Sequence, residues 1–375
     1  MTEPTPALFR PIALRGLDLA NRIAIAPMCQ YSALDGVAQA WHLQQLGSLA
    51  LSGAGLVMTE ATAVEPQGRI TPGCLGLYDD QAEEALGRTI AGIRQFASTP
   101  IGVQLAHAGR KAASHVPWRG GGPLAADEGA WQPSGASPLP HLEGWQIPEE
   151  LDEAGLDRVK NAFVATAQRA LRIGIDLLEL HGAHGYLLHT FLSPLSNQRT
   201  DGYGGSRENR MRFPLEVFDA VRAVWPADRP LGVRVSATDW LEGGLTIADT
   251  IAFGHELKSR GVDFVCISSG GIGRPRIPVG AGYQVPLARQ FRAETGIVTR
   301  AVGMIVKAEH ANRVIEDQDA DMVALARAVI DDPRWPWHAA ATLGAKLAYP
   351  PQYERGTPAL WPGFGLAHAA TAAHD

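Results

Sequence analysis

Hydrophobic residues gather in short runs along this chain, and longer segments with helical periodicity separate the runs. A strand of a parallel sheet is buried on both faces, so it reads as a nearly continuous apolar run. By this criterion the sequence predicts eight strands, at residues 23–27, 55–61, 100–105, 175–181, 231–236, 264–268, 297–302 and 322–326.

Amphipathic segments with a period near 3.6 fill most of the intervals between these strands, and this pattern predicts helices. The helix beginning near 206 has Ser206 at its start, where a hydroxyl can accept a hydrogen bond from the first turn. The predicted helices span residues 38–52, 81–98, 156–173, 206–224, 247–259, 284–294 and 307–316. Regular alternation of strand and helix predicts an α/β protein folded as a single (β/α)8 TIM barrel.

Two segments depart from the alternation. Residues 9–20 predict a small N-terminal hairpin with Gly16 at its turn, and residues 107–149 are irregular and rich in Gly, Pro and Trp. Because the irregular segment follows the third strand, it is expected to form a cap over an active site. No charge run marks a domain boundary, so residues 1–375 are expected to form one TIM-barrel domain. The barrel would span about 23–345 and the tail 346–375, with a mobile end at 367–375.

Composition narrows the class of protein. The chain has 375 residues, of which 46% are hydrophobic and 19% charged, so it can bury a large core. A net charge of −6 argues against nucleic acid or an anionic membrane as a partner. The first six residues lack the features of a signal peptide, and the three cysteines are too scattered for a disulfide framework. We therefore expect a cytoplasmic protein without a membrane partner.

The richest candidate chemistry follows the fourth strand, where residues 181–186 read His-Gly-Ala-His-Gly-Tyr. Catalytic side chains of a TIM barrel lie at the C-terminal ends of its strands. One isolated histidine would be interpreted as structural, but His181, His184 and Tyr186 together favour a site. A metal site is the alternative, and it needs a third ligand that Glu179 or His189 could supply.

Four motifs stand out along the chain: Pro-Met-Cys-Gln-Tyr at 27–31, Gln-Leu-Ala-His-Ala-Gly-Arg at 104–110, the 181–186 motif, and Ser-Pro-Leu-Ser-Asn-Gln-Arg-Thr-Asp-Gly-Tyr-Gly-Gly-Ser at 193–206. Together they resemble the Old Yellow Enzyme family of flavin-dependent ene-reductases. The resemblance implies a single FMN-binding TIM-barrel domain. The resemblance runs from about Leu8 to Gly356. Cys29 and the Gln-Tyr-Glu-Arg-Gly ending at 352–356 resemble the thermophilic-like subgroup, which includes bacterial xenobiotic reductases.

The resemblance implies a bound FMN, with NADPH or NADH as hydride donor. The amide of Gln104 matches the pyrimidine edge of a flavin, and Arg234 would stabilise the anionic reduced ring. An ion pair inside the barrel is the alternative role for Arg234. Gly303 and Arg327 would bind the phosphate after strands seven and eight. The remaining cofactor-binding positions that the resemblance implies are Pro27, Cys29, Ala63 and Ala326, the last replacing the family's usual glycine.

The resemblance also assigns the substrate side of the site. His181 and His184 would hold the oxygen of an α,β-unsaturated carbonyl or nitro compound, as an oxyanion hole does. Tyr186 would protonate the α-carbon, since tyrosine has a pKa near 10 and carries its proton at neutral pH. Cys29 would tune the flavin and touch the substrate, which Tyr31 would also bind. Cys74 and Cys266 match no motif and are expected to be structural.

Oligomerisation is a further implication. In the subgroup the arginine of the C-terminal motif reaches into the neighbouring subunit's active site, which makes Arg355 a substrate-binding candidate and predicts a homodimer or homotetramer. Trp361 would either line the pocket or pack the tail. Arg110 and Lys111 would either meet the 2′-phosphate of NADPH or lie in a solvated loop.

Two other classes of function compete with the NADPH dehydrogenase and ene-reductase interpretation. One is a flavin-free barrel lyase or isomerase that uses His181 and His184 on a phosphorylated substrate. The other is a flavin-binding protein without turnover. A colourless purified protein would favour the flavin-free alternative. Failure of an enone to reoxidise protein whose flavin NADPH has reduced would favour the flavin-binding protein without turnover.

Overall fold

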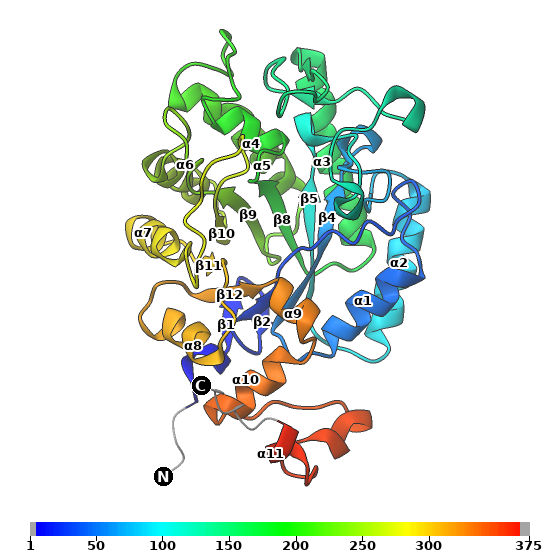
Figure 1. Cartoon of the computed structure of the whole chain (residues 1–375), viewed down its shortest axis with the longest axis vertical. Coiled ribbons are helices and arrows are strands. Elements are labelled where there is room, and N and C mark those ends of the chain that lie inside the picture. The colour runs from blue at the N-terminus through cyan, green and yellow to red at the C-terminus, as the bar shows by residue number, and fades with distance from the viewer. Residues whose placement is uncertain (1–4, 368–375) are drawn as a thin grey trace.

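The computed structural model describes residues 5–367, and its centre is a closed barrel of eight parallel strands (Figure 1). This confirms the predicted TIM barrel. Around the barrel the strands follow the order of the sequence, and the last pairs with the first. They are β3 (Ile23–Ile25), β4 (Leu56–Ala63), β5 (Ile101–Ala106), β8 (Leu177–Gly182), β9 (Leu231–Ser236), β10 (Phe264–Ser268), β11 (Thr299–Ala301) and β12 (Met322–Leu325).

Helices cover the outside of the barrel (Figure 1). The predicted ones are α1 (Ala40–Ala50), α2 (Asp80–Arg94), α3 (Glu153–Arg172), α5 (Arg207–Val224), α6 (Ile247–Ser259), α7 (Val285–Thr295) and α8 (Ala308–Glu316). Ser206 caps α5 as expected, because its Oγ accepts a hydrogen bond from the N–H of Asn209 at 3.2 Å. Sequence patterns missed α4 (Leu187–Leu192), α9 (Arg327–Asp331), α10 (Trp335–Leu343) and α11 (Phe364–Ala367).

Strand side chains alternate between the helices and the barrel interior. On β8, Leu178 and Leu180 pack outward in the main core, while Leu177 joins a separate interior cluster. The predicted hairpin consists of β1 (Ile12–Leu14) and β2 (Leu17–Leu19). Its Leu14 and Leu19 belong to the interior cluster, so the hairpin closes the N-terminal end of the barrel.

The segment after β5 is irregular, as expected, and forms a cap of short turns. Its regular pieces are η3 (Gly109–Lys111), η4 (Pro117–Arg119), η5 (Ala126–Glu128) and the pair β6 (Ser134–Gly135) with β7 (Glu149–Glu150). Arg199 fastens the cap to the loop after α4, because its guanidinium donates to the carbonyls of Ala136 at 3.2 Å and Leu151 at 2.8 Å.

Strand β4 extends two residues beyond the prediction. Its register against β5 shifts between Met58 and Ala61, which is a bulge of the kind that redirects side chains near functional sites. Glu60 within this bulge accepts a hydrogen bond from the N–H of Gln30 at 3.2 Å. The bulge therefore fixes the loop after β3, which carries Cys29.

The C-terminal segment packs beside α10 (Figure 1). Tyr353, in the turn η6 (Pro351–Gly356), lies 5.9 Å from Trp337 between ring centroids, and Arg334 lies over both rings. Apart from Ala367, the predicted mobile end lies outside the described residues. Among the residues that the structure describes, none of the helices has the length and apolar character needed to cross a membrane.

A buried ion pair lies inside the barrel. Glu179 on β8 and Arg300 on β11 form it, and both side chains are 0% exposed. Gln104 Nε2 on β5 donates to the same carboxylate at 2.7 Å. Burial alone would lower the pKa of Arg300, but the Glu179 carboxylate raises it above its usual value. An ion pair inside the barrel was the alternative role for Arg234. The structure contains such a pair, but Arg300 forms it instead of Arg234.

We predict that Arg300→Met strongly destabilises the fold, because it leaves the Glu179 carboxylate buried without its charge partner. Removing one member of such a pair typically costs about 3–5 kcal/mol. Urea unfolding at pH 7 measures the free energy of unfolding.

Arg88→Met is the matched control, since Arg88 and Glu84 form an ion pair on the exposed surface of α2. Such pairs contribute at most about 1 kcal/mol. If both variants lost the same small amount of stability, the interior pair would not be the constraint that we infer.

Candidate active site

A cavity of about 540 Å³ opens at the C-terminal ends of the strands, where a TIM barrel places its active site. Five residues that the sequence singled out contribute to its wall, namely His184, Arg234, Gly303, Ala326 and Arg327. The structure thus brings together side chains from β9, from the loop after β8 and from the loops after β11 and β12.

The histidine pair lies at the end of β8. His181 pairs in register with Arg234 of β9 and is almost fully buried. His181 Nε2 lies 3.3 Å from His184 Nδ1, and His184 Nε2 lies 2.7 Å from Ser268 Oγ. The free ring nitrogen of the pair is therefore His181 Nδ1, which is buried and without a partner among the described residues.

Both histidines are neutral in this environment. Burial lowers the pKa of His181 and of His184 well below the usual value, and the nearby Arg234 guanidinium lowers both further. A neutral imidazole carries one N–H donor and one acceptor nitrogen. The pair can therefore donate hydrogen bonds at neutral pH without becoming charged.

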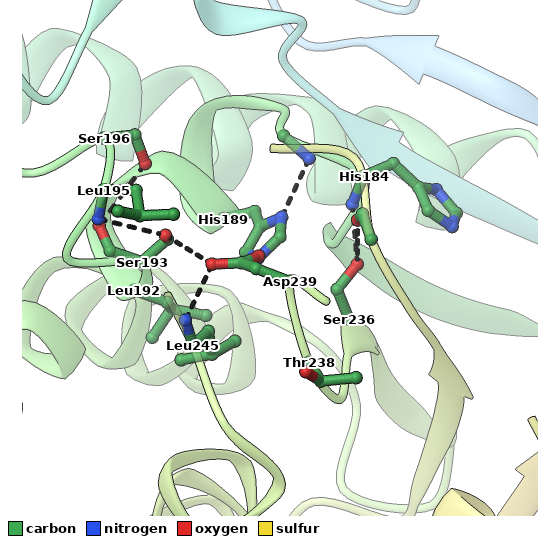
Figure 2. Close-up of polar contacts among 12 residues, drawn as sticks. His184, His189, Leu192, Ser193, Leu195, Ser196, Ser236, Thr238, Asp239 and Leu245 are labelled. Carbon is green, nitrogen blue, oxygen red and sulfur yellow. Dashed lines mark hydrogen bonds and ion pairs between the residues drawn. The ribbon is translucent and has the colours of Figure 1, made fainter. Parts of the chain in front are cut away.

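The backbone around His184 is held from two sides. Its N–H donates to Ser236 Oγ at 3.0 Å, as Figure 2 shows, and Lys111 Nζ donates to its carbonyl at 2.7 Å. His184 itself has φ = +61°, in the left-handed region that non-glycine residues rarely adopt. These contacts hold a strained backbone conformation at the wall of the cavity.

A buried network fixes the next residue (Figure 2). The N–H of Gly185 donates to His189 Nδ1 at 2.8 Å, and His189 Nε2 lies 3.1 Å from Asp239 Oδ1. Ser193 Oγ donates to the other carboxylate oxygen of Asp239 at 2.6 Å. This network engages His189, and Arg300 engages Glu179, so both third ligands considered for a metal site have other partners.

Tyr186 follows on the same turn. The centroid of its ring lies 5.0 Å from that of His181, and the Lys111 ammonium lies 5.6 Å from the ring. Burial raises the pKa of Tyr186 well above its usual value, and the neighbouring Cys29 and Tyr31 raise it further. The Tyr186 hydroxyl therefore keeps its proton at neutral pH.

The loop after β3 supplies Pro27, Cys29 and Tyr31, all half-buried. Tyr31 packs edge-on against Trp118 of the cap, with ring centroids 5.6 Å apart. Because Cys29 and Tyr31 both act on the pKa of Tyr186, this loop faces the turn that carries the histidines.

Three further predicted cofactor residues lie on the barrel wall. Ala63 ends β4 and is buried, and Gln104 holds Glu179 with its amide nitrogen, which leaves its amide oxygen for another partner. Arg234 takes part in none of the ion pairs formed by the described residues, and its Nε is buried without a hydrogen-bond partner there. An unpaired, partly buried guanidinium favours a site for an anionic or electron-rich ligand.

The wall near Gly303 contains polar residues that sequence reasoning missed. Ser269 Oγ donates to Gln284 Oε1 at 2.6 Å, and Ser268 Oγ lies 3.4 Å from the same oxygen. Gly303 has φ = +111°, and a Cβ built there would lie 2.7 Å from Gln284 Nε2. The sequence contained one sign of this polar wall, which is the serine pair Ser268 and Ser269 at the end of the sixth predicted strand.

Some predicted residues lie apart from the cavity. Arg355 is exposed in η6, and Trp361 packs against Phe364 of the tail at 6.1 Å between ring centroids. Arg110 and Lys111 do not form a solvated loop. The Arg110 guanidinium lies 3.2 Å from the carbonyl of Pro140, and burial lowers the pKa of Lys111 to about 7.

A TIM barrel whose mouth carries neutral histidines, a protonated tyrosine and an unpaired guanidinium has the features of an enzyme that binds an electron-rich organic ligand. The NADH:flavin oxidoreductase / NADH oxidase family model matches residues 7–345. The chain belongs to this family, which confirms the resemblance to Old Yellow Enzyme.

Curated relatives extend over nearly the whole chain. The NADPH dehydrogenase of Geobacillus thermodenitrificans (strain NG80-2) is 44% identical over 351 residues, covering 93% of this chain and 98% of the relative. That of Bacillus subtilis (strain 168) is 41% identical with the same coverage. A NADH:flavin oxidoreductase of Gibberella zeae is 43% identical over 335 residues, covering 84% of this chain and 81% of the relative.

Solved structures agree with this result. Morphinone reductase superposes with a TM-score of 0.76 at 30% identity, and the match covers 94% of each chain. The chain is therefore a flavin-dependent oxidoreductase of the Old Yellow Enzyme type, with FMN and a nicotinamide nucleotide as cofactors. The flavin-free lyase or isomerase interpretation is wrong.

We predict that Gly303→Ala weakens FMN binding by about 10-fold or more. The added Cβ meets Gln284 at the cavity wall, and about 1.4 kcal/mol of lost binding energy is enough for that factor. The measurement is the dissociation constant from fluorescence titration of FMN-stripped protein.

Gly344→Ala is the matched control. Gly344 ends α10 with φ = +72°, and a Cβ there meets no atom within 4 Å, so the backbone strain is similar but the site is untouched. Equal losses of FMN affinity in the two variants would show that general destabilisation, and not the cavity wall, causes the effect.

Proposed function

We propose that this protein is an ene-reductase, which reduces the activated C=C bond of α,β-unsaturated carbonyl or nitro compounds. The observation that carries the proposal is the placement of the neutral pair His181 and His184 next to the ring of Tyr186, whose hydroxyl keeps its proton. Bound FMN supplies the hydride, which it receives from NADPH or NADH. The remaining chemistry falls to side chains of this chain.

Residues of the barrel wall fit the flavin. The buried, unpartnered Nε of Arg234 and the free amide oxygen of Gln104 suit the polar edge of its ring. Gly303 leaves room where a side chain would collide, and Arg327 at the start of α9 suits the phosphate, as in other barrels. The proposed cofactor site is completed by Pro27, Cys29, Ala63 and Ala326.

The histidines are proposed to hold the substrate's oxygen. Two N–H donors that converge on an oxygen stabilise the negative charge that develops there, and one such donor contributes about 3–4 kcal/mol. His181 Nδ1 is free for this role, whereas His184 Nε2 contacts Ser268 and would exchange that contact for the substrate. The loop contacts of His184 keep its backbone in place during the exchange.

Tyr186 is the proposed proton donor to the α-carbon. Its hydroxyl lies on the same turn as the histidines, and its raised pKa keeps it protonated. Tyr31 and Cys29 on the facing loop are proposed substrate contacts. We also propose a cytoplasmic location, supported by the three unpaired cysteines.

We predict that Tyr186→Phe slows the reaction with the alkene and spares the reaction with NADPH. Loss of a positioned acid typically lowers a rate by about 100- to 10,000-fold. In anaerobic stopped-flow experiments, NADPH should bleach the variant's flavin at the wild-type rate, and cyclohexenone should reoxidise it slowly. Because the pKa of Tyr186 is raised, the wild-type reoxidation rate should show no alkaline loss from this group up to about pH 10.

Tyr203→Phe is the control, because the Tyr203 hydroxyl lies 3.3 Å from Glu216, on α5 at the outside of the barrel. It should leave both rates unchanged. Wild-type protein that is bleached by NADPH but not reoxidised by any enone or nitroalkene would refute the ene-reductase proposal.

We further propose that the protein is a homodimer or homotetramer in which Arg355 reaches a neighbouring active site. Arg355 is exposed, and exposed apolar side chains lie on the same C-terminal segment, at Tyr353, Leu360 and Trp361. Exposed apolar side chains gathered on one segment are typical of an interface.

Coexpression of two variants tests this arrangement. We predict that Arg355→Ala raises KM for the enone about 10-fold, since it removes one charge-assisted contact. A mixed oligomer of Arg355→Ala with Tyr186→Phe should contain a site with both side chains intact and regain wild-type KM. No recovery in mixed oligomers, with mass measured by light scattering, would place Arg355 in its own subunit's site or outside any site.

A further inference from the structure

A second cavity, of about 370 Å³, lies at the end of the barrel opposite the proposed active site. Arg22 and Asp321 in its wall directly precede β3 and β12, so the cavity lies where these strands begin. Arg10, which follows η1 (Ala7–Phe9), and Arg292 on α7 also line it. TIM barrels place their active sites at the other end, so the proposed reaction gives these three arginines no role.

The carboxylate of Asp321 is fully engaged by one of these arginines. Arg292 donates to it twice, from Nε to Oδ2 and from a terminal nitrogen to Oδ1, each at 3.0 Å. The N–H of Thr299 also donates to Oδ2, at 2.9 Å. Because a bidentate pair uses both carboxylate oxygens, Arg292 and Asp321 neutralise each other, and Asp321 has little capacity left for a second guanidinium.

The other two arginines bind carbonyl groups and form no ion pair with the described residues. Arg10 Nε donates to the carbonyl of Thr5 at 3.0 Å, and a terminal nitrogen of Arg22 donates to the carbonyl of Asp321 at 2.9 Å. Arg22 Nε is buried and finds no hydrogen-bond partner in the part of the chain that the structure describes. Burial lowers the pKa of Arg22, the Asp321 carboxylate opposes this, and Arg10 and Arg292 lower it further. The positive charge of this wall is therefore incompletely balanced.

Hydrogen bonds hold the walls of the cavity in place. The N–H of Arg22 donates to the carbonyl of Leu8 at 2.9 Å, and the N–H of Leu8 donates to Asn312 Oδ1 on α8 at 3.0 Å. Arg292 donates to the carbonyl of Gln318, another residue of the wall, at 3.2 Å. A ligand would therefore meet guanidinium groups that are already positioned, which reduces the entropic cost of binding.

We propose that this cavity is a binding site for a phosphate-bearing anion, either a free diphosphate or a phosphate ester. The proposal goes beyond the proposed function and does not depend on it. A guanidinium presents its donors as a planar fork, which phosphate oxygens can accept from in pairs. The volume lies in the range of small-molecule sites. Ala7, Ile315 and Ala320 add an apolar side on which an organic group could pack.

Glu316 provides a test of opposite sign. It is exposed at the end of α8, contributes to the same wall, and forms no ion pair with any described residue. A negative charge at this position repels a bound anion. Removing an arginine should therefore weaken binding, whereas removing the charge of Glu316 should strengthen it.

The test is calorimetric titration of FMN-loaded enzyme with pyrophosphate at low ionic strength. Bound FMN occupies the flavin's own phosphate site, so the heat reports the second cavity. One site per chain is expected. Arg10→Gln and Arg22→Met should each weaken binding about 10-fold or more, because each removes a charge-assisted contact. Glu316→Gln should strengthen it several-fold. Arg10 is exposed, so Arg10→Gln keeps the test decisive if Arg22→Met does not fold.

Arg289→Met is the matched control. Arg289 is exposed on α7, one turn before Arg292, and lies 3.7 Å from Asp319, and neither residue of this pair lines the cavity. The control should bind pyrophosphate as the wild type does. No measurable binding, or equal affinity in the wild type, Arg10→Gln and Arg22→Met, would overturn the proposal.

A parallel titration with ADP separates the two sources of phosphate. Tighter binding of ADP than of pyrophosphate, lost in Arg10→Gln, would identify a phosphate ester as the ligand, and weaker binding of ADP would identify free diphosphate. ADP binding that the arginine variants leave unchanged would place the nucleotide outside this cavity and count against the ester. These titrations need no enone, so failure of the ene-reductase proposal would leave their result interpretable.

Discussion

The buried ion pair between Glu179 and Arg300 in the barrel interior constrains much of this structure. Glu179 is held by Arg300 from across the barrel and by Gln104 from the next strand, and none of the three side chains is free to move independently. Because alternate residues of a strand share a face, Glu179 lies directly below His181. The ion pair therefore fixes the depth and rotation of β8, and with them the position from which the histidines enter the site.

Above the ion pair, hydrogen bonds of backbone groups position the loop that follows β8. Ser236 and Lys111 hold the peptide of His184, while His189 and Asp239 hold that of Gly185. Fully buried polar networks of this kind limit a loop to one arrangement. The result is a site whose histidines and tyrosine are neutral by burial but whose backbone is fixed by charged and polar groups behind it.

Sequence patterns predicted the eight strands, the hairpin, the cap and many residues of the cavity wall, because burial on both faces and strand-end chemistry are local signals. They did not predict partners across the barrel. The match of Glu179 with Arg300 joins residues 121 apart, and the match of His189 with Asp239 joins two segments that follow different strands. Helices α4 and α9 are too short to show helical periodicity in the sequence. The β4 bulge does not alter the pattern of hydrophobic residues, so this pattern could not predict it.

Backbone strain is distributed unevenly between the two ends of the barrel. Of the eight non-glycine residues with positive φ in the described chain, six lie on loops that follow strands at the cavity end: Tyr31, Asp35, Ala113, His184, Trp240 and Met304. Each such residue costs about 1–3 kcal/mol. Few substitutions at this end can therefore raise thermal stability, because relieving the backbone strain would displace functional groups. The opposite rim, with the hairpin and the short loops that enter the strands, can accept stabilising substitutions without touching the chemistry.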